Sequence, residues 1–210
     1  MLKQHTLSIP VGKKTLHLET GKIARQAGGS ILLRCEETAV LATACAAAAP
    51  AEGVDFFPLR VDYQERFSSV GKTASGFIKR EGRPAEREIL TSRLIDRPLR
   101  PMFEEGYYNE VQVLAYVLSY DALHLPDVLA ICAASAALVI SEIPLIKPIG
   151  AVRVGLIEGT FVINPTSEEM KQSKLDLVLA GTEDAILMIE GFCDFLTEEQ
   201  VIEAIETGHK

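Results

Sequence analysis

The sequence predicts an α+β fold in which a mixed sheet is covered by packed helices. Segments with the residue alternation of strands occur in runs, and helical segments interrupt these runs without strict strand–helix alternation. Hydrophobic residues make up 48% of the 210 residues, which is ample for a packed core. No proline-rich or charged linker divides the chain, so we expect one domain over residues 1–210.

Strands dominate the first part of the chain. Residues 31–33 and 39–44 read as two strands, because two short apolar runs flank a polar turn. Residues 55–63 alternate apolar and polar side chains and predict another strand. The small residues of 68–76 predict a loop that leads to Phe77.

Two helices and a central strand are expected in the middle of the chain. A helix should run from about Pro84 to Asp96, since proline suits a first turn and Pro98 should force the helix to end. Residues 111–119 are apolar on both faces, as in a central strand. Residues 127–141 are apolar all round and rich in alanine, which indicates a helix inside the core.

The last part of the chain predicts more strands and a closing helix. Residues 150–164 read as a hairpin, and residues 175–180 and 185–190 as two further strands. Thr197 and Gln200 have the spacing of a capping box and should start the closing helix.

Positive charge is concentrated in one segment. Residues 79–100 hold seven basic and four acidic side chains, whereas the rest of the chain holds 14 basic and 25 acidic ones, and the net charge is −8. Such a focus on an acidic background indicates an anionic partner that is held at one place. Six of the seven are arginines, whose planar fork matches phosphate oxygens. The seven residues are Lys79, Arg80, Arg83, Arg87, Arg93, Arg97 and Arg100.

The same charges also fit ion pairs on a helix surface. On a helical wheel, Arg87, Arg93 and Arg97 fall within an arc of about 120° that also contains two leucines. Interleaved leucines favour guanidiniums that face a groove, a subunit or internal carboxylates over a fully solvated face. The three-residue spacing of Arg93 and Asp96 keeps structural ion pairing open as the alternative.

Several classes of site have no support in the sequence. It contains no GxGxxG, GxSxG or HExxH motif, and Gly71-Lys72-Thr73 lacks the upstream glycine of a phosphate-binding loop. The four cysteines form no CxxC pair, so structural zinc is not expected. Asp176, inside an apolar strand, is either a desolvated acid with a function or the polar face of a half-exposed strand, and we favour the second interpretation.

The expected location is the cytoplasm, without membrane insertion. Residues 1–10 lack the apolar core of a secretory signal, and the longest apolar run, 128–140, is too short to cross a bilayer. Cysteines in alanine-rich apolar stretches suit a reducing compartment.

Four stretches of sequence carry a family resemblance. They are VDYQERF at 61–67, GFIKREGRPAEREILTSRLIDRPLRP at 76–101, NEVQV at 109–113 and SKLDLVLAGT at 173–182. Together they resemble the amino-terminal ribonuclease-PH-like core domain of the polynucleotide phosphorylase family, and the similarity covers essentially all 210 residues.

The resemblance implies a fold, an activity and partners. The fold is the ribonuclease-PH-like one, which is ribosomal protein S5 domain 2-like. Members of the family are homotrimeric, magnesium-dependent exoribonucleases that degrade single-stranded RNA from the 3′ end, with inorganic phosphate in place of water, and release nucleoside diphosphates. We therefore expect Mg²⁺ to be needed by the full-length protein but not to bind this chain.

The resemblance also implies RNA-binding residues. Residues 76–80 match a loop that narrows the central channel, so Phe77 is expected to stack on a base while Lys79 and Arg80 contact phosphates. Four arginines are expected to line the approach or brace subunits: Arg83, Arg93, Arg97 and Arg100.

Two departures from the family pattern limit what this chain is expected to do. Ile78 and Lys79 stand where the family has an aromatic residue and an arginine, so stacking and phosphate contact should be weaker. Residues 123–134 contain no serine cluster, and Asp176 alone remains of the catalytic acidic pair, so no catalytic or metal-binding residue is expected.

The chain is therefore expected to be a fragment that binds RNA and forms the ring, without the chemical step. Residues 200–210 are expected to run into the start of a helical linker. The alternative is a non-catalytic ribonuclease-PH-like scaffold subunit of an RNA-degrading ring.

Overall fold

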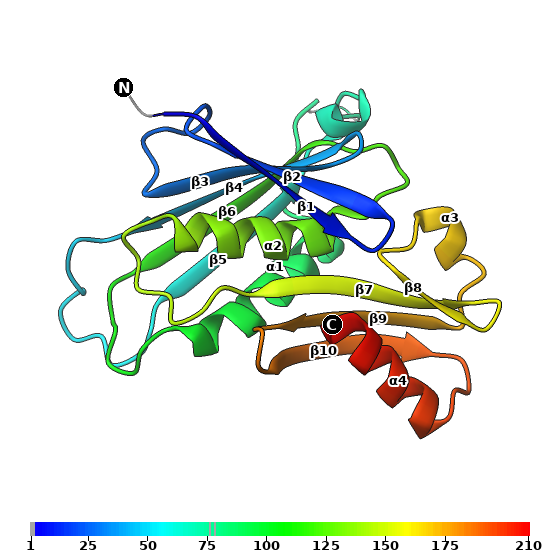
Figure 1. Cartoon of the computed structure of the whole chain (residues 1–210). Coiled ribbons are helices and arrows are strands. Elements are labelled where there is room, and N and C mark those ends of the chain that lie inside the picture. The colour runs from blue at the N-terminus through cyan, green and yellow to red at the C-terminus, as the bar shows by residue number, and fades with distance from the viewer. Residues whose placement is uncertain (1–2, 76, 78) are drawn as a thin grey trace.

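A computed structural model describes residues 3–75, 77 and 79–210 of the chain. Two sheets and a central helix form the body (Figure 1), and the α+β prediction is confirmed. Gly76 and Ile78 lie outside the described residues. The expectation that Ile78 weakens the loop concerns one of these two residues, so it stays a prediction.

The first sheet has six strands. Their spatial order is β1 (His5–Val11), β2 (Lys14–Thr20), β3 (Gly29–Cys35), β4 (Thr38–Ala46), β6 (Val111–Ser119) and β5 (Leu59–Glu65). The sheet is mixed, because β6 pairs antiparallel with β4 and parallel with β5. Alternate residues of β6, from Val111 to Val117, are buried, as the period of a strand requires.

The second sheet is antiparallel and has four strands. Their order is β10 (Ile186–Cys193), β9 (Leu175–Gly181), β7 (Gly150–Ile157) and β8 (Thr160–Ile163). The hairpin predicted for residues 150–164 and the two strands that follow it are confirmed. The capping box at Thr197 and Gln200 is also confirmed, and it starts α4 (Glu198–His209), which packs on this sheet.

Helix α2 (Pro126–Val139) joins the two sheets, as the apolar run predicted. Buried residues of α2 belong to a single core cluster that also contains side chains of both sheets. Small residues allow this close approach: a Cβ added to Gly29 of β3 would lie 1.9 Å from the carbonyl oxygen of Ala137. In the part of the chain that the structure describes, no helix is both long and apolar enough to cross a membrane.

Helix α1 (Glu86–Leu99) begins two residues after Pro84, which lies before the helix instead of in its first turn, and it ends three residues later than predicted. Pro98 lies inside its last turn, so the prediction that this proline ends the helix was wrong. Pro98 and Leu99 are both buried, and the packing of this turn outweighs the hydrogen bond that proline cannot donate. A 3₁₀ turn, η2 (Arg100–Met102), continues directly from the helix.

Two other expectations differ from the structure. Strand β5 begins at Leu59 instead of Asp55, because Pro58 precedes it and Phe57 packs against Phe103, with 4.4 Å between their ring centroids. The β1–β2 hairpin was not predicted, although β1 and β2 pair along their whole lengths. A remaining short helix, α3 (Ser167–Met170), follows β8.

Candidate nucleic-acid interface

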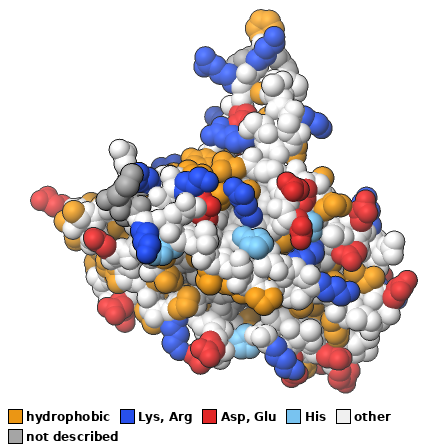
Figure 2. Space-filling model, turned by 45° about the horizontal axis from the view of Figure 1, so that its top comes forward, with side chains coloured by type: hydrophobic (Ala, Val, Ile, Leu, Met, Phe, Trp, Pro, Cys, Tyr) orange, Lys and Arg blue, Asp and Glu red, His pale blue; other side chains and the backbone are white. Residues whose placement is uncertain are grey.

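A basic arm projects from the body of the molecule (Figures 1 and 2). We use this name for the described residues of the connection between β5 and α1, which are 66–75, 77 and 79–85. The arm begins with a 3₁₀ turn, η1 (Phe67–Val70), and the backbone N–H of Tyr120 donates to the carbonyl of Ser69 at 2.9 Å, which ties this turn to the end of β6. Figure 2 shows Lys and Arg side chains along the projection and a hydrophobic side chain at its tip.

The outer part of the arm presents an aromatic ring beside free cations. Phe77 is fully exposed, with 103% of its reference surface accessible. Lys79, Arg80 and Arg83 are exposed as well, and none of them forms a salt bridge with another described residue. Lys79 has a φ of 50°, in the left-handed region that non-glycine residues seldom adopt. The arm therefore offers a π-face and positive charge to solvent together.

The arginines of α1 are divided between free and paired. Arg93 is exposed, and the ion pair with Asp96 that we kept as an alternative does not form, because Asp96 binds Arg100 at 2.6 Å. Arg97 reaches across to Glu190 of β10 at 2.5 Å. Both carboxylate contacts are at the surface, where such pairs are weak and exchangeable.

Arg100 has a structural contact set. Its guanidinium donates to the backbone carbonyls of Phe57 and Leu59 at 3.0 and 3.3 Å, and it lies 5.8 Å from the centroid of the Phe57 ring. It thereby holds the start of β5 against the end of α1. Structural ion pairing, the alternative of the sequence analysis, is thus present at Arg87, which lies 3.6 Å from Glu65, and at Arg97 and Arg100. Lys79, Arg80 and Arg83 form no salt bridge with a described residue and remain available.

Two carboxylates, those of Glu81 and Glu88, connect the two ends of the arm where it leaves the body. We call these two residues and the groups that they bind the neck. Glu81 accepts from the guanidinium of Arg66 and, at 2.9 Å, from the backbone N–H of Phe67. Glu88 accepts from the N–H of Glu65 at 2.8 Å and from that of Ala85 at 2.6 Å. Each carboxylate therefore joins the strand that enters the arm to the segment that leaves it.

The charges of the neck stabilise each other. The hydrogen bond from Arg66, together with that from the Phe67 N–H, holds the pKa of Glu81 below its usual range. The hydrogen bond to Glu81 raises the pKa of Arg66. Arg66 also lies 5.8 Å from the centroid of the Tyr116 ring of β6. The sequence analysis missed this pair, because its two residues are 15 positions apart and neither belongs to a recognisable motif.

A partly buried ion triad connects β7, α2 and β9. Arg153 of β7 is 8% exposed and donates to Asp127 of α2 at 2.6 Å and to Asp176 of β9. Asp127 is buried, whereas 43% of the Asp176 side chain is exposed. Asp176 thus lies on the half-exposed polar face of a strand, which is the interpretation that we favoured, and its partner there is Arg153.

The triad determines what this region can bind. The N-terminus of α2, which as a helix end attracts anions, is occupied by the carboxylate of Asp127, which also accepts from the N–H of Val128 at 2.8 Å. The guanidinium of Arg153 stands between the two aspartates, so the residues present do not fit Mg²⁺. Within the described ranges there is no cluster of three or more His, Cys, Asp or Glu side chains able to hold a metal.

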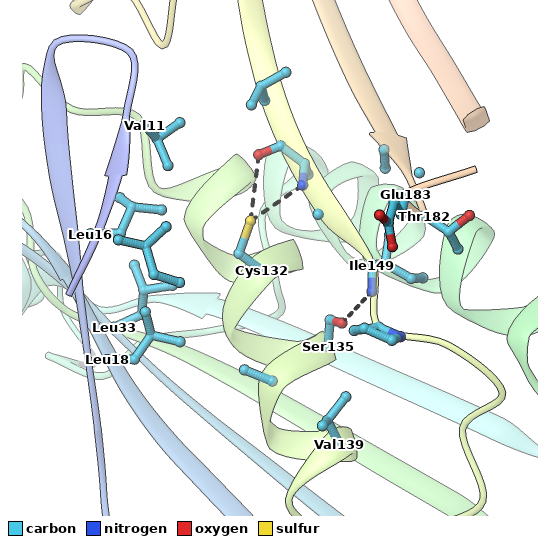
Figure 3. Close-up of a pocket in the computed structure, with 18 of the residues that line it drawn as sticks. Val11, Leu16, Leu18, Leu33, Cys132, Ser135, Val139, Ile149, Thr182 and Glu183 are labelled. Atoms are coloured by element: carbon cyan, nitrogen blue, oxygen red, sulfur yellow. Dashed lines mark hydrogen bonds between the residues drawn. The ribbon is translucent and has the colours of Figure 1, made fainter. Parts of the chain in front are cut away.

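A separate, mostly apolar groove of about 850 Å³ is lined by the β1–β3 face, α2, the adjacent ends of β7 and β9, and the end of α4 (Figure 3). Val11, Leu16 and Leu33 point into it from the first sheet, and Val139 from α2. One of its polar side chains, Ser135, accepts from the N–H of Ile149 at 2.8 Å. Such a lining does not suit a phosphate chain, so the arm remains the candidate interface.

Comparisons with known proteins find relatives that match the whole chain. Polyribonucleotide nucleotidyltransferases of Protochlamydia amoebophila and Chlamydia felis are 68% and 63% identical to the chain over 209 and 206 residues, which cover 100% and 98% of it. The chain spans about 30% of the length of these curated relatives. The crystal structure of rice Rrp46 is similar in fold, with a TM-score of 0.68 and 18% identity over 98% of this chain and 87% of that one.

Two family models also match, and they meet where the first sheet gives way to the second. Domain 1 of the 3′ exoribonuclease family matches residues 13–144, and domain 2 matches residues 147–210. The chain therefore belongs to the 3′ exoribonuclease family of ribonuclease-PH-like proteins.

Proposed function

We propose that this chain is the RNA-binding, ring-forming first core domain of a polyribonucleotide nucleotidyltransferase. The enzyme, as a whole, would remove nucleotides from the 3′ end of RNA with inorganic phosphate and release nucleoside diphosphates. The family membership and the names of relatives that match the whole chain support this proposal. We further propose a homotrimer, located in the cytoplasm and not in a membrane.

One observation carries the RNA-binding part of the proposal: a fully exposed phenylalanine stands beside free cations at the end of a projection. Phe77 would stack on a base, while Lys79 and Arg80 contact the phosphates on either side. Every base has a π-face and every nucleotide a phosphate, so this arrangement holds single-stranded RNA without reading its sequence. Arg83 and Arg93, also free, would continue the path, whereas Arg97 and Arg100 would brace the body.

The test compares two phenylalanines of equal exposure. Phe77→Ala should weaken binding of single-stranded oligo(A) by about 1–3 kcal/mol, the contribution of one stacked base. Phe195→Ala removes a ring that is also fully exposed but lies between β10 and α4, and it should leave the affinity unchanged. Equal affinities of the two variants would contradict the role of Phe77.

We propose that the chemical step takes place outside these 210 residues. The Arg153 triad fills the region where a phosphate and Mg²⁺ would be expected in a catalytic domain, so the metal would be held by another part of the longer enzyme. The chain alone, given phosphate, Mg²⁺ and poly(A), is expected to release no ADP. Measurable release would show that the active site is misplaced.

The same triad is what favours the second candidate, a non-catalytic scaffold subunit of an RNA-degrading ring. Both candidates use the arm in the same way, and both make the chain one unit over residues 1–210, which the shared core cluster supports. They differ in one measurable respect. A protein of the relatives' full length should release ADP from poly(A) under the first proposal and none under the second.

A further inference from the structure

We propose that Glu81 is a positioning residue for RNA binding, which acts by fixing the direction in which the arm presents Phe77. The inference rests on the proposed function of the arm as an RNA-binding element. It assigns a role to an acidic residue inside the most basic segment of the chain, where a negative charge would otherwise oppose the ligand.

The geometry of the neck supplies the first step. Glu81 uses both oxygens, one for the Arg66 guanidinium and one for the Phe67 N–H. A carboxylate that binds a guanidinium and an adjacent backbone N–H at once fixes both the distance and the orientation between the start of the arm and the part that returns to α1. Without it, the two ends of the arm would be joined by contacts nearer the body, among them those of Glu88 and Arg87 with Glu65.

The second step is the connection from the neck to the sheet. Arg66 follows β5 directly, and its guanidinium lies near the Tyr116 ring on the neighbouring strand β6. The first turn of the arm is also bound to β6 through Ser69 and Tyr120. Glu81 therefore connects the part of the arm that returns to α1, through Arg66, to the first sheet. The direction in which Phe77 points is then fixed relative to this sheet.

The third step is energetic. A loop that is held in its binding conformation before it meets the ligand does not lose that freedom on binding. The contribution of Glu81 to affinity would thus come from pre-organisation, while its charge acts in the opposite sense. Removal of the charge should weaken RNA binding if pre-organisation dominates and strengthen it if the repulsion of phosphate dominates. This difference makes the inference testable.

The first experiment measures the mobility of the arm tip in the absence of RNA. The chain contains no tryptophan, so Phe77→Trp creates a single fluorescent reporter at the tip. Adding Glu81→Gln should lower the fluorescence anisotropy of this tryptophan, because the tip moves more freely. Adding Glu86→Gln, which removes an exposed carboxylate in the first turn of α1, should leave the anisotropy unchanged. Equal anisotropy in the Glu81→Gln protein would overturn the inference.

The second experiment measures binding of single-stranded oligo(A) to otherwise unaltered protein. Glu81→Gln should weaken binding by about three- to tenfold, the usual effect of having to order flexible side chains on association. Glu86→Gln changes the net charge equally and should bind at least as tightly as the original protein. The urea midpoint of unfolding should differ little between the two variants, because exposed ion pairs contribute little to global stability and the neck lies outside the core cluster. Tighter binding by Glu81→Gln would show that its charge alone matters.

A third variant separates this inference from the proposed function. Lys79→Ala/Arg80→Ala should weaken RNA binding whether or not the neck positions the arm. If this variant weakens binding and Glu81→Gln does not, the positioning role fails and the RNA-binding arm stands. If Lys79→Ala/Arg80→Ala binds as the original protein does, the proposed function fails and the positioning role fails with it.

Discussion

The arm and the triad use the same chemical group in opposite settings. Arg80 and Arg83 stand in solvent on a projection, free of any described carboxylate, whereas Arg153 lies in the interior between two aspartates. A buried guanidinium is held by its partners and cannot serve a ligand, while an exposed one retains its capacity to bind phosphate. The number of arginines in a segment therefore says less about function than the burial of each one.

The largest effect is expected from removing the interior guanidinium. Arg153→Met should lower the free energy of unfolding by about 3–5 kcal/mol, because it leaves the buried carboxylate of Asp127 without compensation. Urea denaturation measures this loss. Arg93→Met, on the exposed face of α1, is the matched control and should change stability by less than about 0.5 kcal/mol. Similar losses of unfolding free energy in the two variants would contradict the distinction between a buried, paired arginine and an exposed, free one.

An intermediate effect is expected at the turn before α2, where a carboxylate is partly buried. Asp121 accepts from the backbone N–H groups of Leu123 and His124, both at 2.8 Å, and from the His124 ring at 2.5 Å. Burial alone would raise its pKa, but these hydrogen bonds outweigh that effect and lower the pKa from 3.8 to about 2. Asp121→Asn should therefore lower the free energy of unfolding by about 2 kcal/mol at neutral pH.

The pH dependence of this difference has a definite sign. A carboxylate whose pKa is lower in the folded than in the unfolded state stabilises the fold above the unfolded value and loses that contribution as the pH falls through the folded value. The gap between Asp121→Asn and the original protein should hold from pH 7 down to about 4 and then narrow toward pH 2. Urea titrations at pH 7, 4 and 3 follow it, and a gap that widens on acidification would refute the assignment.

The smallest effect on stability is expected at the arm. Lys79→Ala/Arg80→Ala removes two exposed cations that have no salt bridge with a described residue, so the unfolding free energy should change by less than about 0.5 kcal/mol. Stability loss above about 1 kcal/mol would mean that these residues support the fold, as Arg100 does.

The parts of the fold that the sequence predicted are those determined by neighbouring residues. The strands β3 and β4, the central strand β6 and the buried helix α2 follow from apolar patterns within a few positions of each other. Pro98 was misinterpreted because its effect on α1 depends on tertiary packing of the last turn, which local propensity does not contain.

The parts of the site that could not be predicted are pairings between distant residues. Phe77 and the cations beside it were identified from a continuous run of sequence. Arg97 has its partner 93 positions away, at Glu190, and the triad depends on the antiparallel register that places β7 beside β9. A lone arginine in the apolar strand β7 was the available signal for Arg153, but no local pattern named its partners.

The salt dependence of RNA binding tests the central claim most directly. For the original protein and for Lys79→Ala/Arg80→Ala, the logarithm of the association constant is plotted against the logarithm of the salt concentration, with oligo(A) and with oligo(U). Loss of two phosphate contacts should reduce the magnitude of the slope by about 1.4, equally for both RNAs. Lys13→Ala/Lys171→Ala, which removes two exposed cations outside the arm, should leave the slope unchanged. An unaltered slope in the arm variant, or a loss confined to one RNA, would contradict the account.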